Sequence, residues 1–199
     1  DAELDFQVAV QDADNDATSS VNLHVTIEAG TSFTGTTSGD VMQGSSGNDT
    51  LSGLAGDDVL VGGLGNDLLI GGADNDTYQW LAGDSGTDTV QGFVHNFNGN
   101  AQGDRLDLSQ LLTGEHAQAG DIGNLLSFID ISSANLGGGL ALDTVIKVST
   151  TAELDPAASA EQTIVLQDVN LFTSYGAGGD EATVILGMLN DGTLKVDVA

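Results

Sequence analysis

The 199-residue sequence contains no cysteine, so neither a disulfide framework nor a thiolate metal site is available to it. It is also poor in positive charge, because three Lys and Arg residues face 30 Asp and Glu residues and the formal net charge is −27. Such a surface repels nucleic acid and anionic membranes and attracts cations. The ligands that remain are hard oxygen atoms, which favour calcium or magnesium.

Long apolar runs are missing as well. No stretch of 18 apolar residues is present, so we expect no membrane insertion, and the chain does not open on a basic and apolar leader. If the protein is exported, an N-terminal signal peptide in this stretch is not the route. Because the chain begins inside what reads as a strand, we expect it to be a piece of a longer protein. We expect it to be a monomer.

Catalytic motifs are absent too. The three histidines, His24, His95 and His116, are scattered and no HExxH motif is present, which argues against a metalloprotease. The string GDSG at residues 83–86 matches a short serine-protease sequence, but no histidine and aspartate pair with it, so we expect a coincidence. The sequence therefore predicts a module that is not an enzyme.

What the sequence does contain is a nine-residue repeat. Residues 62–70 and 71–79 read GGLGNDLLI and GGADNDTYQ, and rows at 35–43, 44–52 and 53–61 precede them in the same register. The sixth position is always aspartate and the eighth is always large and apolar. These residues are Asp40, Asp49, Asp58, Asp67 and Asp76, and Met42, Leu51, Leu60, Leu69 and Tyr78. A fixed period of this kind indicates a stacked repeat architecture.

Each row has the composition of a turn followed by a short strand. The first six positions are rich in Gly, Asn and Asp, which tolerate positive φ, and the last three place one apolar side chain between two others. Two rows complete a flattened coil, so strands of successive coils stack in parallel about 4.8 Å apart. The aspartates then form two columns, with Asp49 and Asp67 on one edge and Asp40, Asp58 and Asp76 on the other.

The pattern G-G-x-G-x-D-x-U-x, in which U is large and apolar, resembles the repeats-in-toxin (RTX) calcium β-roll. The resemblance implies that the sixth-position aspartates of turns 18 residues apart share a calcium ion, and that carbonyl groups at the second and fourth positions complete the shell. Oxygen ligands throughout suit Ca²⁺ and not zinc. The implied count is about three or more ions, with Asp58 shared most. The implied carbonyl ligands are Ser45, Gly47, Leu54, Gly56, Gly63, Gly65, Gly72 and Asp74.

Some rows depart from the family pattern. Leu54 and Asp74 replace glycines, and the first row lacks glycine at its second and fourth positions, so the end rows are the weaker sites. The alternative for the whole block is a set of solvated turn aspartates. The weaker candidate ligands are Asp12, Asp14 and Asp16 in an acidic turn, which a plain turn explains equally well, and Asp84 and Asp88, which could close the last site.

Outside the rows the chain reads as β-rich. Residues 1–30 contain two alternating strands, which we expect to be a remnant hairpin of an upstream immunoglobulin-like extender domain. We expect residues 31–80 to form a β-roll like that of the RTX family, and residues 81–199 to form a β-rich C-terminal region. Strands are predicted at 92–97, 141–149, 162–170 and 192–198, and helices at 121–129 and 180–190.

We expect the C-terminal region to cover apolar side chains that face outward from the middle rows, so that roll and tail form one unit. Those side chains are Val59, Val61, Leu68 and Ile70. The predicted fold class is therefore all-β: a parallel calcium β-roll packed against a β-rich C-terminal extension with one or two short helices, preceded by a remnant hairpin of an immunoglobulin-like sandwich.

The C-terminal region also resembles the target domain of type I secreted proteins. The resemblance rests on residues 88–112, on the strand-rich stretch after them and on the ending Asp197, Val198 and Ala199. It implies an uncleaved export signal and the type I secretion machinery as partner. An ordinary end of a β-domain is the alternative.

The predicted function is a calcium-dependent folding and secretion module. Its parent resembles giant RTX adhesins, which hold bacteria to surfaces and biofilms, and the sequence leaves the adhesive target open. At low cytosolic calcium the acidic chain stays unfolded for export, and calcium outside a Gram-negative cell triggers its folding at or near the cell surface. The alternatives are the same module on a secreted hydrolase or toxin, and a calcium-dependent ligand-binding domain.

Overall fold

The computed structural model describes residues 31–95, 103–112, 125–136, 142–150, 161–176, 178 and 180–197. The hairpin expected at residues 1–30 lies outside the described residues. The roll strands are β1 (Ser32–Thr34), β2 (Val41–Gln43), β3 (Thr50–Ala55), β4 (Val59–Val61), β5 (Leu68–Ala73), β6 (Thr77–Gln79), β7 (Gly86–Gln91) and β8 (Arg105–Asp107). The tail elements are β9 (Ile129–Ala134), β10 (Asp143–Val148), β11 (Gln162–Leu166), α2 (Leu171–Ser174), α3 (Glu181–Asp191) and β12 (Leu194–Lys195).

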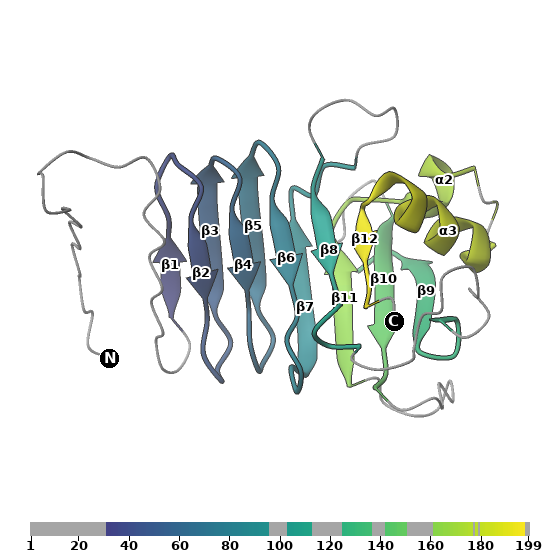
Figure 1. Ribbon diagram of the computed structural model, residues 1–199, viewed down its shortest axis with the longest axis horizontal. Coiled ribbons are helices and arrows are strands. Elements are labelled where there is room, and N and C mark those ends of the chain that lie inside the picture. The colour runs from purple at the N-terminus through teal and green to yellow at the C-terminus, as the bar shows by residue number, and fades with distance from the viewer. Residues whose placement is uncertain are drawn as a thin grey trace, which may run out of the picture.

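Successive strands of the roll alternate between two sheets. Strands β1, β3, β5 and β7 lie side by side in one sheet, and β2, β4, β6 and β8 in the other (Figure 1). The pairing is parallel throughout, with a shift of 18 residues among β1 to β6, as when Ser32 lies opposite Thr50 and Val41 opposite Val59. Two nine-residue rows therefore make one turn of a flattened coil, and the predicted parallel β-roll is confirmed.

The eighth residue of each row points between the two sheets. Leu51, Leu60, Leu69 and Tyr78 are 0% exposed, and Met42 is 8% exposed. These side chains belong to one core cluster that continues into the tail, through residues such as Ile164 of β11 and Leu194 of β12. Burial of a large aliphatic side chain contributes about 1.5–3 kcal/mol, so this inner row is a main source of stability.

The C-terminal region extends both sheets at the end of the roll. Strand β11 pairs in parallel with β7, β10 and β9 follow in antiparallel order, and β12 pairs in parallel with β8. These pairings give hydrogen-bond partners to the backbone groups of the last coil, which would otherwise be exposed at an uncapped sheet edge.

We expected the C-terminal region to join the roll by covering its outward-facing side chains, and this prediction is wrong for the described residues. No strand of the described tail pairs with β4 or β5, whose partners are other roll strands. Of those side chains Val61 is 5% exposed, and Val59, Leu68 and Ile70 are half-buried. The tail packs on the end of the stack instead, because end-on pairing satisfies both the backbone and the core.

Several tail elements match their predicted positions. Strands β10, β11 and β12 lie within the segments predicted for them, and α3 begins after Asp180, whose side chain accepts a hydrogen bond from the Ala182 N–H. The strand predicted at 92–97 is wrong in its described part, because the chain leaves β7 at Gly92, where φ is +79°. Of the helix predicted at 121–129, the described residues 125–128 form a turn that leads into β9.

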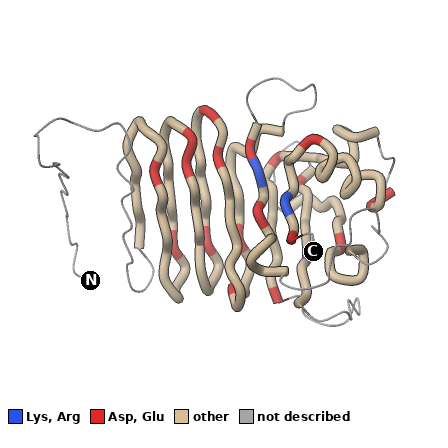
Figure 2. Tube along the Cα trace, viewed as in Figure 1, with Lys and Arg blue, Asp and Glu red and all other residues tan. Residues whose placement is uncertain are grey.

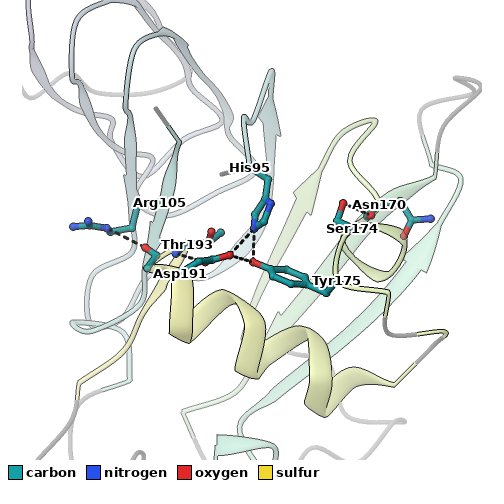
Figure 3. A network of polar contacts seen from close by, with 8 residues as sticks. His95, Arg105, Asn170, Ser174, Tyr175, Asp191 and Thr193 are labelled. Carbon is teal, nitrogen blue, oxygen red and sulfur yellow. Dashed lines mark hydrogen bonds and ion pairs between the residues drawn. The ribbon is translucent and has the colours of Figure 1, made fainter. Parts of the chain in front are cut away.

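A polar cluster holds both helices against the last coil (Figure 3). The Nε2 atom of His95 hydrogen-bonds with the Tyr175 hydroxyl and lies 3.1 Å from Asp191 Oδ2. The same hydroxyl donates to Asp191 Oδ2 at 2.7 Å. Arg105 on β8 donates through Nε to the Gly192 carbonyl at 3.3 Å. The ends of α2 and α3 are thereby fixed to the segment after β7 and to β8.

We expect Leu69→Ala to lower the free energy of unfolding in calcium by about 2–5 kcal/mol, because it leaves a cavity between the sheets. The control is Leu64→Ala in the turn of the same row. Leu64 is 43% exposed, so its loss should change the free energy by no more than about 0.5 kcal/mol. Chemical denaturation measures both values, and equal losses would contradict the inward packing of the eighth position.

Candidate metal centre

The sixth-position aspartates form two hydrogen-bonded columns, one on each edge of the roll. Four of these carboxylates, those of Asp49, Asp58, Asp67 and Asp76, accept through Oδ1 the backbone N–H of the residue 18 positions earlier. Asp67 accepts from Asp49 at 2.8 Å, Asp58 from Asp40 at 2.7 Å, and Asp76 from Asp58 at 3.0 Å. Acidic positions accordingly gather along both edges of the roll (Figure 2). The sequence predicted this arrangement of the aspartates.

The columns continue beyond the five predicted rows. Asp88 Oδ1 accepts the Asp67 N–H at 2.9 Å across 21 residues, and Asp104 Oδ1 accepts the Asp76 N–H at 3.0 Å across 28 residues. Residues 83–91, GDSGTDTVQ, are thus a sixth row displaced by three residues, and the GDSG string is part of its turn. Inserted residues break the nine-residue period of the sequence, but the aspartates still stack in the same columns.

Asp104 is a column member that sequence reasoning missed. The signal was present, because Asp104 precedes the fully buried Leu106 by two residues, as every column aspartate precedes an inward side chain. This spacing can be recognised only if the nine-residue register is not required after Gln79.

Three column aspartates have a second carboxylate oxygen that is buried and without a hydrogen-bond partner among the described residues. They are Asp58, Asp67 and Asp76, through Oδ2, and each residue is only 1–2% exposed. A buried charged oxygen without a donor is strongly unfavourable unless a cation lies beside it. The protein alone leaves these three oxygens uncompensated.

Backbone conformation separates these three turns from the first two. Their second and fourth positions have positive φ, with values of 83° at Leu54, 99° at Gly56, 96° at Gly63, 119° at Gly65, 118° at Gly72 and 80° at Asp74. The second-position N–H of the first two rows donates to the aspartate of its own turn, from Thr36 to Asp40 at 2.5 Å and from Ser45 to Asp49 at 2.6 Å. Where φ is positive, no such bond forms and the carboxylate stays open.

Each open carboxylate packs directly against the first-position glycine of its own turn. A Cβ added at Gly62 would stand 2.3 Å from Asp67 Oδ2, and one added at Gly71 would stand 2.1 Å from Asp76 Oδ2. The first-position glycine is therefore required for space. Carbonyl groups face along the column as well, since a Cβ at Gly72 would stand 2.2 Å from the Leu54 oxygen.

Backbone carbonyls would have to supply most of the ligands for a metal. Among the described residues no group of three or more His, Cys, Asp or Glu side chains is placed to hold one. A mixed set of carboxylate and carbonyl oxygens without nitrogen or sulfur is what calcium prefers. The open turns thus fit Ca²⁺, with Asp58, Asp67 and Asp76 as the charged ligands.

The remaining predicted ligands lie at various points of the columns. The Ser45 carbonyl accepts the Leu64 N–H at 3.1 Å, and the Gly47 carbonyl faces Gly65. Asp74 is exposed and accepts the Gly56 N–H through Oδ2 at 3.3 Å, and Asp84 Oδ2 accepts the Leu81 N–H at 2.7 Å. Asp12, Asp14 and Asp16 lie outside the described residues.

Burial raises the pKa of the column carboxyls. The pKa of Asp67 rises to about 7, through burial and the charges of Asp88 and Asp49, and that of Asp58 to about 6. Burial also raises the pKa of Asp88 and of Asp104 to about 6. In the metal-free columns these carboxyls therefore ionise between about pH 6 and 7, well above the ordinary range of an aspartate.

At the tail end of the stack, a basic side chain lies beside a buried carboxylate. Arg105 and Lys195 lie on β8 and β12, where Figure 2 shows blue positions. Lys195 Nζ contacts Asp107 Oδ2 at 2.8 Å, and Ser109 donates to Asp107 Oδ1. Although burial opposes it, these hydrogen bonds lower the pKa of Asp107.

We expect the metal-free protein to become more stable as the pH falls from about 7.5 to about 5. Asp67 and Asp58 have folded pKa values of about 7 and 6, above the ordinary 3.8, so the folded state takes up protons over this range. Each 1 kcal/mol gained raises the melting temperature by about 2–4 °C for a chain of this size. Melting of calcium-free protein at both pH values measures the change.

The control for the pH effect is Asp67→Asn, which removes the group with the highest of these pKa values. It should reduce the difference between the two melting temperatures. A melting temperature that falls on acidification in both proteins would contradict the uncompensated columns.

We expect Leu54→Gly to raise the melting temperature in calcium. Leu54 is 46% exposed and has a φ of +83°, a conformation that costs a non-glycine residue about 1–2 kcal/mol. The control is Leu64→Gly, at the third position of the next row, where φ is not positive. It should lower the free energy of unfolding by about 0.5–1 kcal/mol. Thermal melting compares the two, and equal losses would show that the turn does not impose positive φ.

The rows match a known family, and the whole chain matches a solved structure more weakly. Residues 34–69 and 43–78 match the model of the RTX calcium-binding nonapeptide repeat, which contains four copies. The solution structure of the AlgE6R3 subunit from the Azotobacter vinelandii mannuronan C5-epimerase is similar at 24% identity and a TM-score of 0.45, covering 71% of this chain and 73% of that one. No curated protein gives a significant match. None of the described helices is long and apolar enough to span a bilayer. Residues 34–78 are RTX calcium-binding nonapeptide repeats.

Proposed function

We propose that this chain is a calcium-dependent folding module of a secreted protein, and that calcium binding in the RTX turns drives its folding outside the cell. The observation that carries the proposal is the set of three buried oxygens, on Asp58, Asp67 and Asp76, that lack a donor among the described residues. Without metal, the compact state must hold these oxygens together with a net charge of −27. A divalent ion in each open turn removes that penalty.

The energies are large enough for a folding switch. Extracellular calcium modules have dissociation constants of about 10⁻⁴ to 10⁻³ M. Calcium at 100 times the dissociation constant stabilises the folded state by about 2.7 kcal/mol per site. Three sites give about 8 kcal/mol, against a total domain stability of about 5–15 kcal/mol. Calcium therefore decides whether the compact state is populated.

The tail takes part in the same transition. Its strands β11 and β12 pair with β7 and β8, which are the last strands of the two roll sheets. Core residues of roll and tail lie in one cluster. Folding of the roll provides the edges on which the tail assembles, so the proposed switch includes both.

For the parent protein we propose a cell-surface RTX adhesin of a Gram-negative bacterium, exported unfolded by the type I secretion machinery. RTX repeats followed by a β-rich C-terminal region support this proposal, and so does an acidic composition that disfavours folding where calcium is scarce. On this proposal the module adds no catalytic activity and serves to fold and anchor the exported chain.

Titration of the metal-free chain with calcium to about 10 mM, followed by circular dichroism and thermal melting, tests the proposed switch. We expect a cooperative gain of β structure that magnesium does not reproduce, because magnesium demands a stricter octahedral shell. A fully folded metal-free chain whose melting temperature ignores calcium would overturn the proposal.

The matched variants are Asp58→Asn and Asp57→Asn, which each remove one negative charge. Asp58 is 1% exposed and has an open oxygen, whereas Asp57 is exposed at the fifth position and accepts the Asn75 N–H at 3.0 Å. An asparagine can keep that bond, because Asn48, at the equivalent position of its row, accepts the Asn66 N–H through its amide oxygen. We expect Asp58→Asn to raise the calcium midpoint at least about tenfold, or about 1.4 kcal/mol, and Asp57→Asn to leave it within about twofold.

A further inference from the structure

We infer that hydrogen-bond donors of the chain itself close both ends of the two aspartate columns, so that calcium enters only the turns at residues 53–58, 62–67 and 71–76. The inference rests on the proposed function and adds the number and the positions of the ions. The columns consist of Asp40, Asp49, Asp58, Asp67, Asp76, Asp88 and Asp104. Only the middle three retain an open Oδ2.

At the start of the columns, the closing donors come from a hydroxyl residue at the second position of the turn. Thr36 donates to Asp40 Oδ2 from its backbone N–H at 2.5 Å and from its hydroxyl at 2.9 Å. Ser45 makes the same pair of bonds to Asp49 Oδ2, at 2.6 and 3.0 Å. In the later rows this position has positive φ and supplies no such donors.

At the far end of one column, Asp88 is closed by two buried side chains. Its Oδ2 accepts the indole Nε1–H of Trp80 at 2.7 Å and the amide Nε2–H of Gln162 at 2.8 Å. All three residues are 0% exposed. An indole nitrogen can only donate, and a carboxylate fixes the amide with its nitrogen inward. Two donors thus occupy the place where the middle turns leave a bare oxygen.

At the far end of the other column, the backbone closes Asp104. Its Oδ2 accepts the Val94 N–H at 2.8 Å, and its Oδ1 already accepts from Asp76. Both oxygens of Asp104 are therefore satisfied by the protein.

The closure of Asp88 gives a role to the insertion that breaks the nine-residue period. Trp80 lies in the three residues inserted before the sixth row, and Gln162 lies on β11 of the tail. The insertion and the tail together supply the donors that replace a cation. Beyond the open turns the chain itself supplies the hydrogen bonds to the carboxylate, at the point where the tail strand β11 pairs with β7.

Native mass spectrometry of the full 199-residue chain at saturating calcium counts the ions directly. We expect three. Asp67→Asn should reduce the count by one, whereas Asp88→Asn, the next member of the same column, should leave it unchanged. The pair is matched in chemistry and in burial, at 2% and 0% exposed.

A gain of an ion is the sharper test. Trp80→Phe combined with Gln162→Leu removes both donors from Asp88 Oδ2 and leaves apolar side chains at both positions. We expect this variant to bind one further calcium ion, and Asp88→Asn added to it should abolish that ion. If the variant does not fold, the comparison of Asp67→Asn with Asp88→Asn decides alone.

The outcomes separate this inference from the function on which it rests. An ion lost in Asp88→Asn, or an unchanged count in Asp67→Asn, would overturn the closure and leave calcium-driven folding intact. A native chain that binds no calcium would overturn both.

Discussion

The fold depends on how a buried carboxylate is neutralised. Each coil buries an aspartate at its edge, because the N–H of the preceding coil needs an acceptor there, as with Asp49 and Asp67. That bond uses one oxygen and leaves the other to be compensated. Donors from the chain do so at the ends of each column, whereas the middle turns leave that oxygen without a donor among the described residues. The backbone hydrogen bonds of the stack are therefore made, but the second oxygens of its middle aspartates remain without a partner in the described part of the chain.

Much of the roll could be read from the sequence because its geometry is local. Aspartate at the sixth position and a large apolar residue at the eighth give the turn, the strand, the inward face and both columns, since 18 residues separate every stacked pair from Asp40 to Asp76. The period predicts nothing once the insertion at Trp80 shifts it. Asp88 and Asp104 remain in the columns because sheet pairing tolerates a longer loop between rows.

What the sequence could not predict is set by contacts between distant residues. One of the two donors that close Asp88 Oδ2 comes from Gln162, 74 residues away. The tail was expected across the outward face of the roll, yet β11 and β12 extend its two sheets. Hydropathy alone does not distinguish an apolar strand that covers a face from one that continues a sheet, since both bury the same side chains. The open edge of the last coil decides between them.

The departures from glycine show how strongly the stack constrains its turns. Leu54, in the middle row, and Asp74, in the last row, stand where the family pattern has glycine, and the end rows were predicted to be the weaker sites. Both residues nonetheless adopt positive φ, at 83° and 80°. A left-handed conformation costs a non-glycine residue about 1–2 kcal/mol, so the turns above and below must impose it. In the first two rows Thr36 and Ser45 have no positive φ, and they close the carboxylate themselves. The backbone conformation at the second position, as much as the residue type, determines which turns stay open to a cation.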